Sequence, residues 1–130
     1  LPAGDYVIEV EKGYSSNFSG TFMLTLNNPT ATDVDLGVIT TLPFSNSYNI
    51  SAINYEADNK ITYKIEITEQ SDYNFNTSTQ VYINLLDSHK NYITSGYQSM
   101  SGTITNPGVY YIEVYWYGYT VNGNLNINLD

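Results

Sequence analysis

The sequence contains no cysteine and no arginine, and it has a single histidine and only four basic residues, all of them lysine. Without cysteine there is no disulfide framework, no thiolate metal site and no thiol redox centre. Without arginine the chain lacks the side chain that most often clamps phosphate and carboxylate groups in a bidentate way. Cysteine-based metal sites and thiol redox enzymes are therefore excluded.

Positive charge is scarce, because four lysines stand against 13 acidic residues and the formal net charge is −9. Nucleic acids and anionic membranes select clusters of Lys and Arg, so the charge balance argues against both as partners. No apolar run approaches the roughly 18 residues that a membrane-spanning helix needs, so we expect no membrane insertion. An acidic surface instead suits cations, basic partners or plain solubility.

What the chain does have is tyrosine, with 14 among 130 residues, in a composition that is 42% hydrophobic. This length is that of one domain, and it can bury a core without a disulfide or a metal. Tyr, Thr, Ile and Val favour strands, while Asn, Gly and Ser favour turns. No segment keeps a helical period over two turns, so the sequence predicts an all-β protein.

Alternation of apolar and polar residues predicts the individual strands. The clearest is Ile61–Ile67, where Thr62, Lys64 and Glu66 face away from the apolar side. A second strand is predicted at Gln80–Leu86, followed by a hairpin turn at Asp87–Asn91, whereas Ser71–Ser78 is predicted to be a polar loop. Eight to ten short strands at a spacing of about 8–12 residues indicate a jelly-roll-like antiparallel β-sandwich.

The two ends of the chain resemble each other. Residues 1–10 (LPAGDYVIEV) and 105–114 (TNPGVYYIEV) share the pattern GxYxIEV, and each is followed by a polar turn and a strand opened by glycine. The pattern predicts a duplicated terminal hairpin. Residues 1–27 either close a preceding repeat or complete this fold or that of a neighbouring copy, because a lone hairpin is marginally stable.

The domain organisation follows from this repeat. We expect a hairpin at residues 1–27, a turn-rich connector at 28–35 and the sandwich module at 36–130. The chain starts at Leu1 without a methionine, so we expect it to be part of a longer precursor.

Three segments carry a resemblance to a known family: ITYKIEI (61–67), VYINLLDSHKN (81–91), and NPGVYYIEV (106–114) with the closing GNLNINL (123–129). Together they resemble the bacterial pre-peptidase C-terminal domain, a family similar to the collagen-binding domains of clostridial collagenases. The resemblance implies a jelly-roll-like sandwich that accompanies secreted proteins and in some members binds collagen and calcium. A secreted or cell-surface location in a bacterium or archaeon is therefore expected. The sequence departs from the family pattern where His89 and Lys90 replace the usual Asn-Gly.

The last of these segments also suggests a binding surface. If Tyr110, Ile112, Val114 and Trp116 face the core, an outward stripe remains, made of Tyr111, Glu113, Tyr115, Tyr117 and Tyr119. Rigid tyrosine rings with polar tips stack on sugars or proline rings at little entropic cost. We therefore predict that these five residues contact an extracellular protein or a polysaccharide. The alternative is that another strand covers this face, such as residues 1–27 of this chain or of a neighbour.

Oxygen-bearing side chains suggest a calcium site. Asp72, Asn74 and Asn76 occur at alternate positions, and Asp33 and Asp35 form a second pair ahead of the sandwich. Carboxylate and amide oxygens are the ligands that Ca²⁺ prefers, so calcium is the one cofactor that the sequence indicates. The alternative is an ordinary polar loop whose side chains bond their own backbone.

Catalytic signals are weak, and we expect that the protein is not an enzyme. His89 lies beside Asp87 and Ser88 in one predicted turn, whereas the members of a catalytic triad converge from separate segments. Two functions stay open. The first is a secreted or cell-surface binding module that uses the tyrosine stripe. The second is a structural repeat or subunit of an extracellular fibre or surface layer, assembled by strand or hairpin complementation with neighbouring copies.

Overall fold

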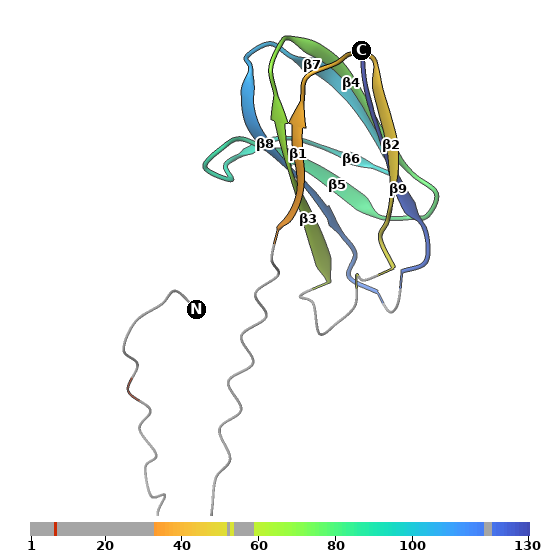
Figure 1. Cartoon of the computed structure of the whole chain (residues 1–130). Coiled ribbons are helices and arrows are strands. Elements are labelled where there is room, and N and C mark those ends of the chain that lie inside the picture. The colour runs from red at the N-terminus through yellow and green to blue at the C-terminus, as the bar shows by residue number, and fades with distance from the viewer. Residues whose placement is uncertain (1–6, 8–32, 52, 54–58, 119–120) are drawn as a thin grey trace, which may run out of the picture.

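The structure is a computed structural model that describes residues 7, 33–51, 53, 59–118 and 121–130. Nine strands account for most of these residues (Figure 1). They are β1 (Val34–Ile39), β2 (Phe44–Asn49), β3 (Lys60–Ile67), β4 (Ser71–Thr77), β5 (Tyr82–Leu86), β6 (Tyr92–Tyr97), β7 (Ser99–Ile104), β8 (Gly108–Tyr115) and β9 (Asn124–Leu129). Within this part of the chain, no helical segment could cross a bilayer.

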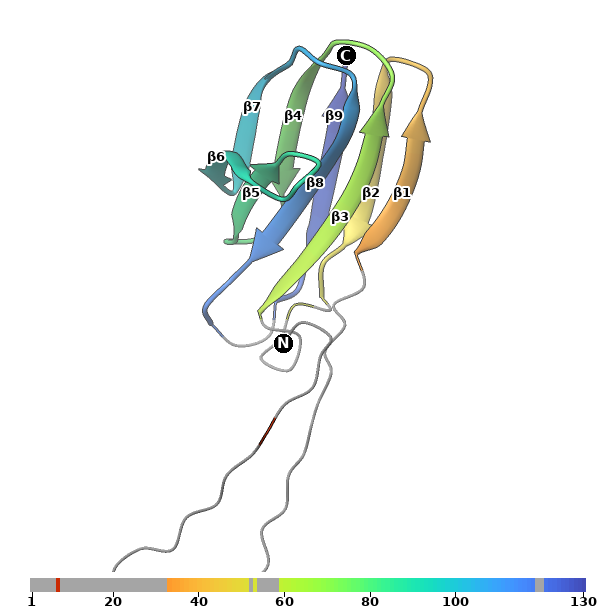
Figure 2. The same ribbon diagram turned by 90° about the vertical axis from the view of Figure 1, so that its left-hand side faces the viewer.

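The strands form one hydrogen-bonded sheet in the order β1-β3-β8-β5-β6-β7-β4-β9-β2. Every neighbouring pair is antiparallel except β1 and β3, which are parallel. β6 and β7 share a single residue pair, Tyr97 with Ser99, and the sheet bends back on itself there. As a result β1, β3, β8 and β5 face β7, β4, β9 and β2 (Figures 1 and 2).

The core lies between these two halves. Ile65 and Ile112 from one half and Phe75 and Ile127 from the other are all buried. Tyr63 of β3 crosses the core to β2, where its hydroxyl donates to the carbonyl oxygen of Asn49 at 3.3 Å. Burial raises the pKa of Tyr63 to about 12. The predicted all-β sandwich is confirmed.

The bend between β6 and β7 depends on a close approach of two backbones. A Cβ atom at Gly96 would collide with the carbonyl oxygen of Ser99, so this position of β6 accepts glycine alone. Gln98, between the two strands, has a left-handed φ of 62°. Its amide donates to the carbonyl of Val81 at 2.9 Å, and its own carbonyl accepts from the amide of Thr77 at 2.8 Å. These bonds tie the bend to both halves.

The segment Ser71–Ser78, predicted as a polar loop, is largely strand β4, and that prediction is wrong. Ser71, Tyr73 and Phe75 point into the core, while Asp72 and Asn74 face solvent. Asn and Asp are uncommon in strands when only residue type is considered. Here the two inward aromatic rings supply enough buried surface to override that tendency, because strand propensity depends on packing context.

The prediction that the C-terminal end forms a hairpin is also wrong. β8 pairs with β3 and β5, whereas β9 pairs with β4 and β2, so the two strands lie in opposite halves of the sandwich. The sequence shows a strand, a turn region and a strand, but it does not show which strands pair. The similar segment at residues 1–27 lies outside the described residues. β1 begins at Val34, inside the predicted connector of residues 28–35.

Candidate functional site

The outward face of β8 carries the predicted tyrosine stripe. Ile112 and Val114 are buried, so Tyr111, Glu113 and Tyr115 lie on the opposite, outer face of the sheet, as their alternation predicts. Tyr117 follows the end of β8 and is 83% exposed. Tyr119 lies outside the residues that the structure describes.

Cross-strand pairing extends this stripe over two further strands. Tyr115 is the register partner of Tyr82 on β5, and Tyr82 is the partner of Tyr97 on β6. The ring centroids of Tyr82 and Tyr115 are 5.3 Å apart, and those of Tyr82 and Tyr97 are 5.1 Å apart. Trp116, which was predicted to face the core, packs partly against it and also stacks beside Tyr82 at 6.1 Å. We call the group the aromatic surface: Tyr82, Tyr97, Tyr115, Trp116 and Tyr117.

Tyr82 and Tyr97 are absent from the residues that the sequence predicts for the site. The signal for Tyr82 is present, because alternation in Gln80–Leu86 turns Val81 and Ile83 inward and leaves Tyr82 outside. The missing information is the register, which sets Tyr82 opposite Tyr115 although the two are distant in sequence.

Polar groups lie directly beside the aromatic surface. The Glu113 carboxylate accepts a hydrogen bond from Nδ2 of Asn84 at 3.0 Å, and Nζ of Lys60 lies 3.6 Å from its other oxygen. Burial raises the pKa of Tyr115, and neighbouring Tyr117 raises it further. A pocket of about 310 Å³ opens here, and its walls include Lys60, Asn84, Glu113, Tyr115, Trp116 and Tyr117.

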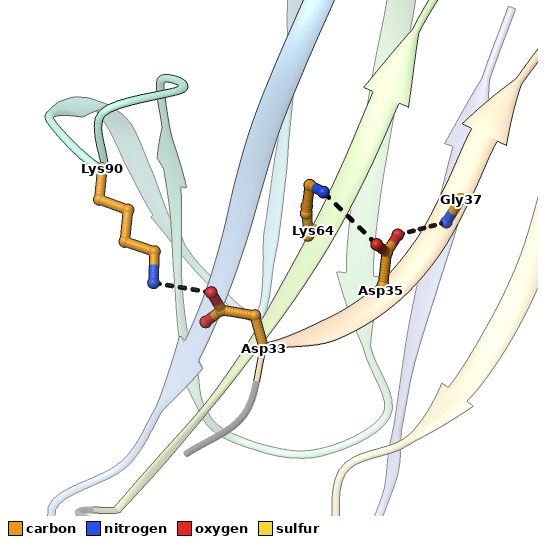
Figure 3. A network of polar contacts seen from close by, with 5 residues as sticks. All are labelled: Asp33, Asp35, Gly37, Lys64 and Lys90. Atoms are coloured by element: carbon orange, nitrogen blue, oxygen red, sulfur yellow. Dashed lines mark hydrogen bonds and ion pairs between the residues drawn. The ribbon is translucent and has the colours of Figure 1, made fainter. Parts of the chain in front are cut away.

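Tyr111 stands apart from the aromatic surface because the chain covers it. Nζ of Lys90 lies 4.9 Å from the centre of the Tyr111 ring, a cation–π contact. The same ammonium is 2.7 Å from Oδ2 of Asp33. Figure 3 shows Lys90 reaching from the turn between β5 and β6 down to Asp33 at the start of β1. The predicted stripe is therefore divided into a covered Tyr111 and an open end at Tyr117.

The turn that carries Lys90 is organised by one carboxylate. Oδ1 of Asp87 accepts hydrogen bonds from the backbone amides of His89 and Asn91, both at 2.9 Å. The bonds from Asn91 are the main cause that lowers the pKa of Asp87. His89 is exposed in this turn, with Nδ1 at 3.3 Å from Oγ of its neighbour Ser88.

The predicted metal ligands Asp33 and Asp35 each face a lysine. Lys90 contacts Asp33, and Nζ of Lys64 lies 3.4 Å from Oδ2 of Asp35 (Figure 3). The backbone amide of Gly37 donates to Oδ1 of Asp35 at 2.8 Å and lowers the pKa of that carboxyl. Calcium at either position would compete with an ammonium group.

The other predicted ligands, Asp72, Asn74 and Asn76, lie along β4. Nδ2 of Asn76 donates to Oδ1 of Asn74 at 3.2 Å, and the same side chain accepts from Asn126 at 2.8 Å. Oδ1 of Asp72 accepts from the Thr103 hydroxyl at 2.6 Å, so oxygens of all three residues are engaged in hydrogen bonds with neighbouring side chains. Among the described residues, no three His, Cys, Asp or Glu side chains gather as a metal site. Calcium binding stays a prediction from the sequence.

No family model and no curated protein matches this sequence. Solved structures do match it. The pre-peptidase C-terminal domain of collagenase from Bacillus anthracis superposes with a TM-score of 0.54 over 80% of this chain and 100% of that chain, at 15% identity. This chain has the fold of a pre-peptidase C-terminal domain. The resemblance inferred from the three sequence segments is thus confirmed for the fold.

A second solved structure is similar at a lower level. Aeromonas hydrophila PliG, a periplasmic lysozyme inhibitor of g-type lysozyme, gives a TM-score of 0.49 over 75% of this chain and 99% of that chain, at 14% identity. At that level of similarity we draw nothing from it about this protein.

Proposed function

We propose that this chain is a non-catalytic binding module of a secreted or cell-surface protein, and that its ligand contacts the aromatic surface together with Glu113. The observation that carries the proposal is the clustering of aromatic rings from three strands on the outer face of the sheet, away from the core. Contiguous exposed aromatic area, rimmed by polar groups, is typical of interaction sites.

The arrangement favours binding because its rings are already ordered. Tyr82 contacts Tyr97 on one side and Tyr115 on the other, and Tyr115 contacts the edge of Tyr117 at 5.6 Å. Side chains that are fixed before binding lose little conformational entropy on binding. Resemblance to pre-peptidase C-terminal domains, which accompany secreted proteins, supports the proposed location.

A single exposed side chain offers the sharpest test. Tyr117→Ala removes a ring that is 83% exposed, so it should weaken retention on the ligand and leave the melting temperature unchanged. Tyr92→Ala is the matched control, because Tyr92 is 65% exposed on β6 but is not part of the aromatic surface. The assay is retention on a panel of insoluble polysaccharides and immobilised extracellular proteins. Equal retention of wild type and Tyr117→Ala, or no retention of the wild type at all, contradicts the proposal.

A second candidate function, assembly with neighbouring copies, is favoured by the sheet edges. Among the described strands, β1 and β2 each have a neighbour on one side alone. Val34 and Val38 of β1 are 39% and 50% exposed, so this edge offers apolar side chains as well as backbone hydrogen-bonding groups. Sedimentation at increasing concentration tests the idea, and a monomer at every concentration excludes it.

A further inference from the structure

The pocket beside the aromatic surface combines two kinds of wall. Lys60 of β3, Asn84 of β5 and Glu113 of β8 form a polar side, and Tyr115, Trp116 and Tyr117 form an aromatic side. Its volume of about 310 Å³ is at the lower end of the range for small-ligand sites. The occupant should therefore be small or be one unit of a longer chain.

The polar side offers donors and acceptors next to each other. The Asn84 amide donates to Glu113 and also bonds the Tyr115 hydroxyl, which leaves its carbonyl oxygen as an acceptor for a ligand. The Glu113 carboxylate has further acceptor positions, and the Lys60 ammonium has three donors. Hydroxyl groups satisfy such a mixed set best, because each hydroxyl both donates and accepts.

The charges of this polar side cancel. Glu113 and Lys60 neutralise each other at 3.6 Å, while the chain as a whole carries a net charge of −9. An anionic ligand would be repelled by the protein, and a cationic one would displace Lys60 from Glu113. An apolar ligand would cut off the Lys60 ammonium and the remaining acceptor positions of Glu113 from water without replacing those hydrogen bonds, which is costly. The electrostatics therefore favour an uncharged, hydroxyl-rich ligand.

The aromatic side suits a flat ring that carries C–H groups. The rings of Tyr115 and Tyr117 meet at 78°, so they form a corner with one face open to the solvent. The face of a tyrosine ring is electronegative and attracts the weakly positive C–H groups that line one side of a sugar ring.

We infer that this pocket binds one unit of an uncharged saccharide, with its ring stacked on Tyr117 or Tyr115 and its hydroxyls bonded to Asn84 and Glu113. This inference rests on the proposed function, because it assigns a ligand class to part of the same surface. It excludes a protein as the occupant of the pocket, since a polypeptide offers few adjacent hydroxyl groups.

The single tryptophan supplies a direct readout. Trp116 lines the pocket and is the chain's one tryptophan, so its fluorescence reports occupancy without a label. The full chain is titrated with soluble oligomers of β-linked glucose, oligomers of N-acetylglucosamine, and dextran. We expect a saturable change with at least one of them. A polyuronate serves as the charged control and should give no change.

Two substitutions in the polar side test the assignment. Asn84→Ala and Glu113→Gln should each weaken saccharide binding by about tenfold, the loss expected for a hydrogen bond to a charged or buried group. Glu66→Gln, an exposed position on the outer side of β3, is the matched control and should bind like the wild type. Glu113→Gln keeps the shape of the side chain and guards against a result caused by unfolding.

The outcomes separate this inference from the proposed function. Loss of binding in Tyr117→Ala without loss in Asn84→Ala and Glu113→Gln leaves the binding surface standing and overturns the saccharide pocket. Retention of protein ligands alone, or binding of the polyuronate, also overturns the saccharide pocket and leaves the binding surface standing. Failure of the wild type to retain any polysaccharide or protein overturns both.

Discussion

The ring of Tyr82 on β5 lies 5.3 Å from the ring of Tyr115 on β8, with 19° between the two ring planes. The two residues are direct cross-strand partners, so the backbone ladder itself sets this stacking. Tyr82 is 37% exposed and Tyr115 is half-buried beneath its neighbours. The pair therefore contributes to folding as well as to the proposed binding surface.

A double-mutant cycle should detect the stacking of this pair. The free energy of unfolding is measured by denaturant titration for wild type, Tyr82→Ala, Tyr115→Ala and the double variant. We expect a coupling energy of about 0.5–1.5 kcal/mol, as found for stacked aromatic pairs. The combination of Tyr115→Ala with Tyr92→Ala is the control and should be additive. Additivity in both cycles would mean that the rings do not stabilise each other.

Removal of Lys90 should uncover Tyr111. Lys90→Ala deletes the ammonium above the Tyr111 ring and the ion pair with Asp33. Exposed ion pairs contribute at most about 1 kcal/mol, so stability should change little, while the rate of chemical nitration of Tyr111 should rise. Lys90→Arg keeps a cation over the ring and should restore protection. An unchanged nitration rate in Lys90→Ala would show that the lysine does not shield this tyrosine in solution.

Asp87 should make the turn between β5 and β6 sensitive to acid. Hydrogen bonds from Asn91 and His89 lower the pKa of Asp87 in the folded protein. A carboxyl group whose pKa is lower in the folded than in the unfolded protein stabilises the fold when the pH is above its unfolded-state pKa. This stabilisation is lost as the pH falls through its folded-state pKa. The protection of the Asn91 amide, measured as its exchange rate relative to that of an unstructured peptide at the same pH, should therefore decrease below pH about 4. In Asp87→Ala this protection should already be low at neutral pH and should not decrease further in acid, and strong protection in that variant would contradict the role of the carboxylate.

Tyr63 should weaken the fold in alkali. Its pKa is raised by burial from 10.0 to about 12, so between these values the unfolded chain loses the phenol proton while the folded chain keeps it. The contribution of Tyr63 to stability should be constant below pH 10, should decrease from pH 10 to about 12, and should show no further loss above that. Tyr63→Phe cannot ionise at this position, so its stability should fall less steeply over the same window. Parallel curves for the two proteins would refute the assignment.

Gly96→Ala should disrupt the bend of the sheet. The added methyl group would meet the carbonyl oxygen of Ser99, a backbone atom that cannot move without displacing β7. We expect a loss of about 1–3 kcal/mol in the free energy of unfolding, the usual cost of forced overpacking. Ser95→Ala, one residue earlier on an exposed position of β6, is the control. A melting temperature equal to that of the wild type would mean that β6 and β7 are less closely apposed than described.

The alternation of apolar and polar residues was sufficient to predict a strand, and the face that it buries, wherever that strand could be considered alone. The predicted strand Ile61–Ile67 differs from β3 by one residue, and the facing of Ile112 and Val114 was correct. In both cases strict alternation with β-branched residues leaves one arrangement that buries the apolar side. Two of the five residues of the aromatic surface, Tyr115 and Tyr117, could be predicted for the same reason.

Pairing between distant strands could not be predicted. Nothing in the residues around Tyr82 states that β5 lies against β8, and the apparent hairpin of β8 and β9 divides between the two halves. β4 was missed because Asp72, Asn74 and Asn76 outweigh Tyr73 and Phe75 in a composition-based judgement. These failures share one cause, which is that register and burial are properties of the assembled sheet.

The parallel pairing of β1 with β3 has a mechanical consequence. β1 starts at the opposite end of the sandwich from Asp130, so a pull applied between Val34 and Asp130 runs along the strands (Figure 1). The ladder between β1 and β3 would then be loaded in shear, with its bonds sharing the force, and would not open one bond at a time. β9 is held on both sides by β4 and β2 and carries the load at the other end. The strand arrangement therefore resists a force applied along the strands between Val34 and Asp130.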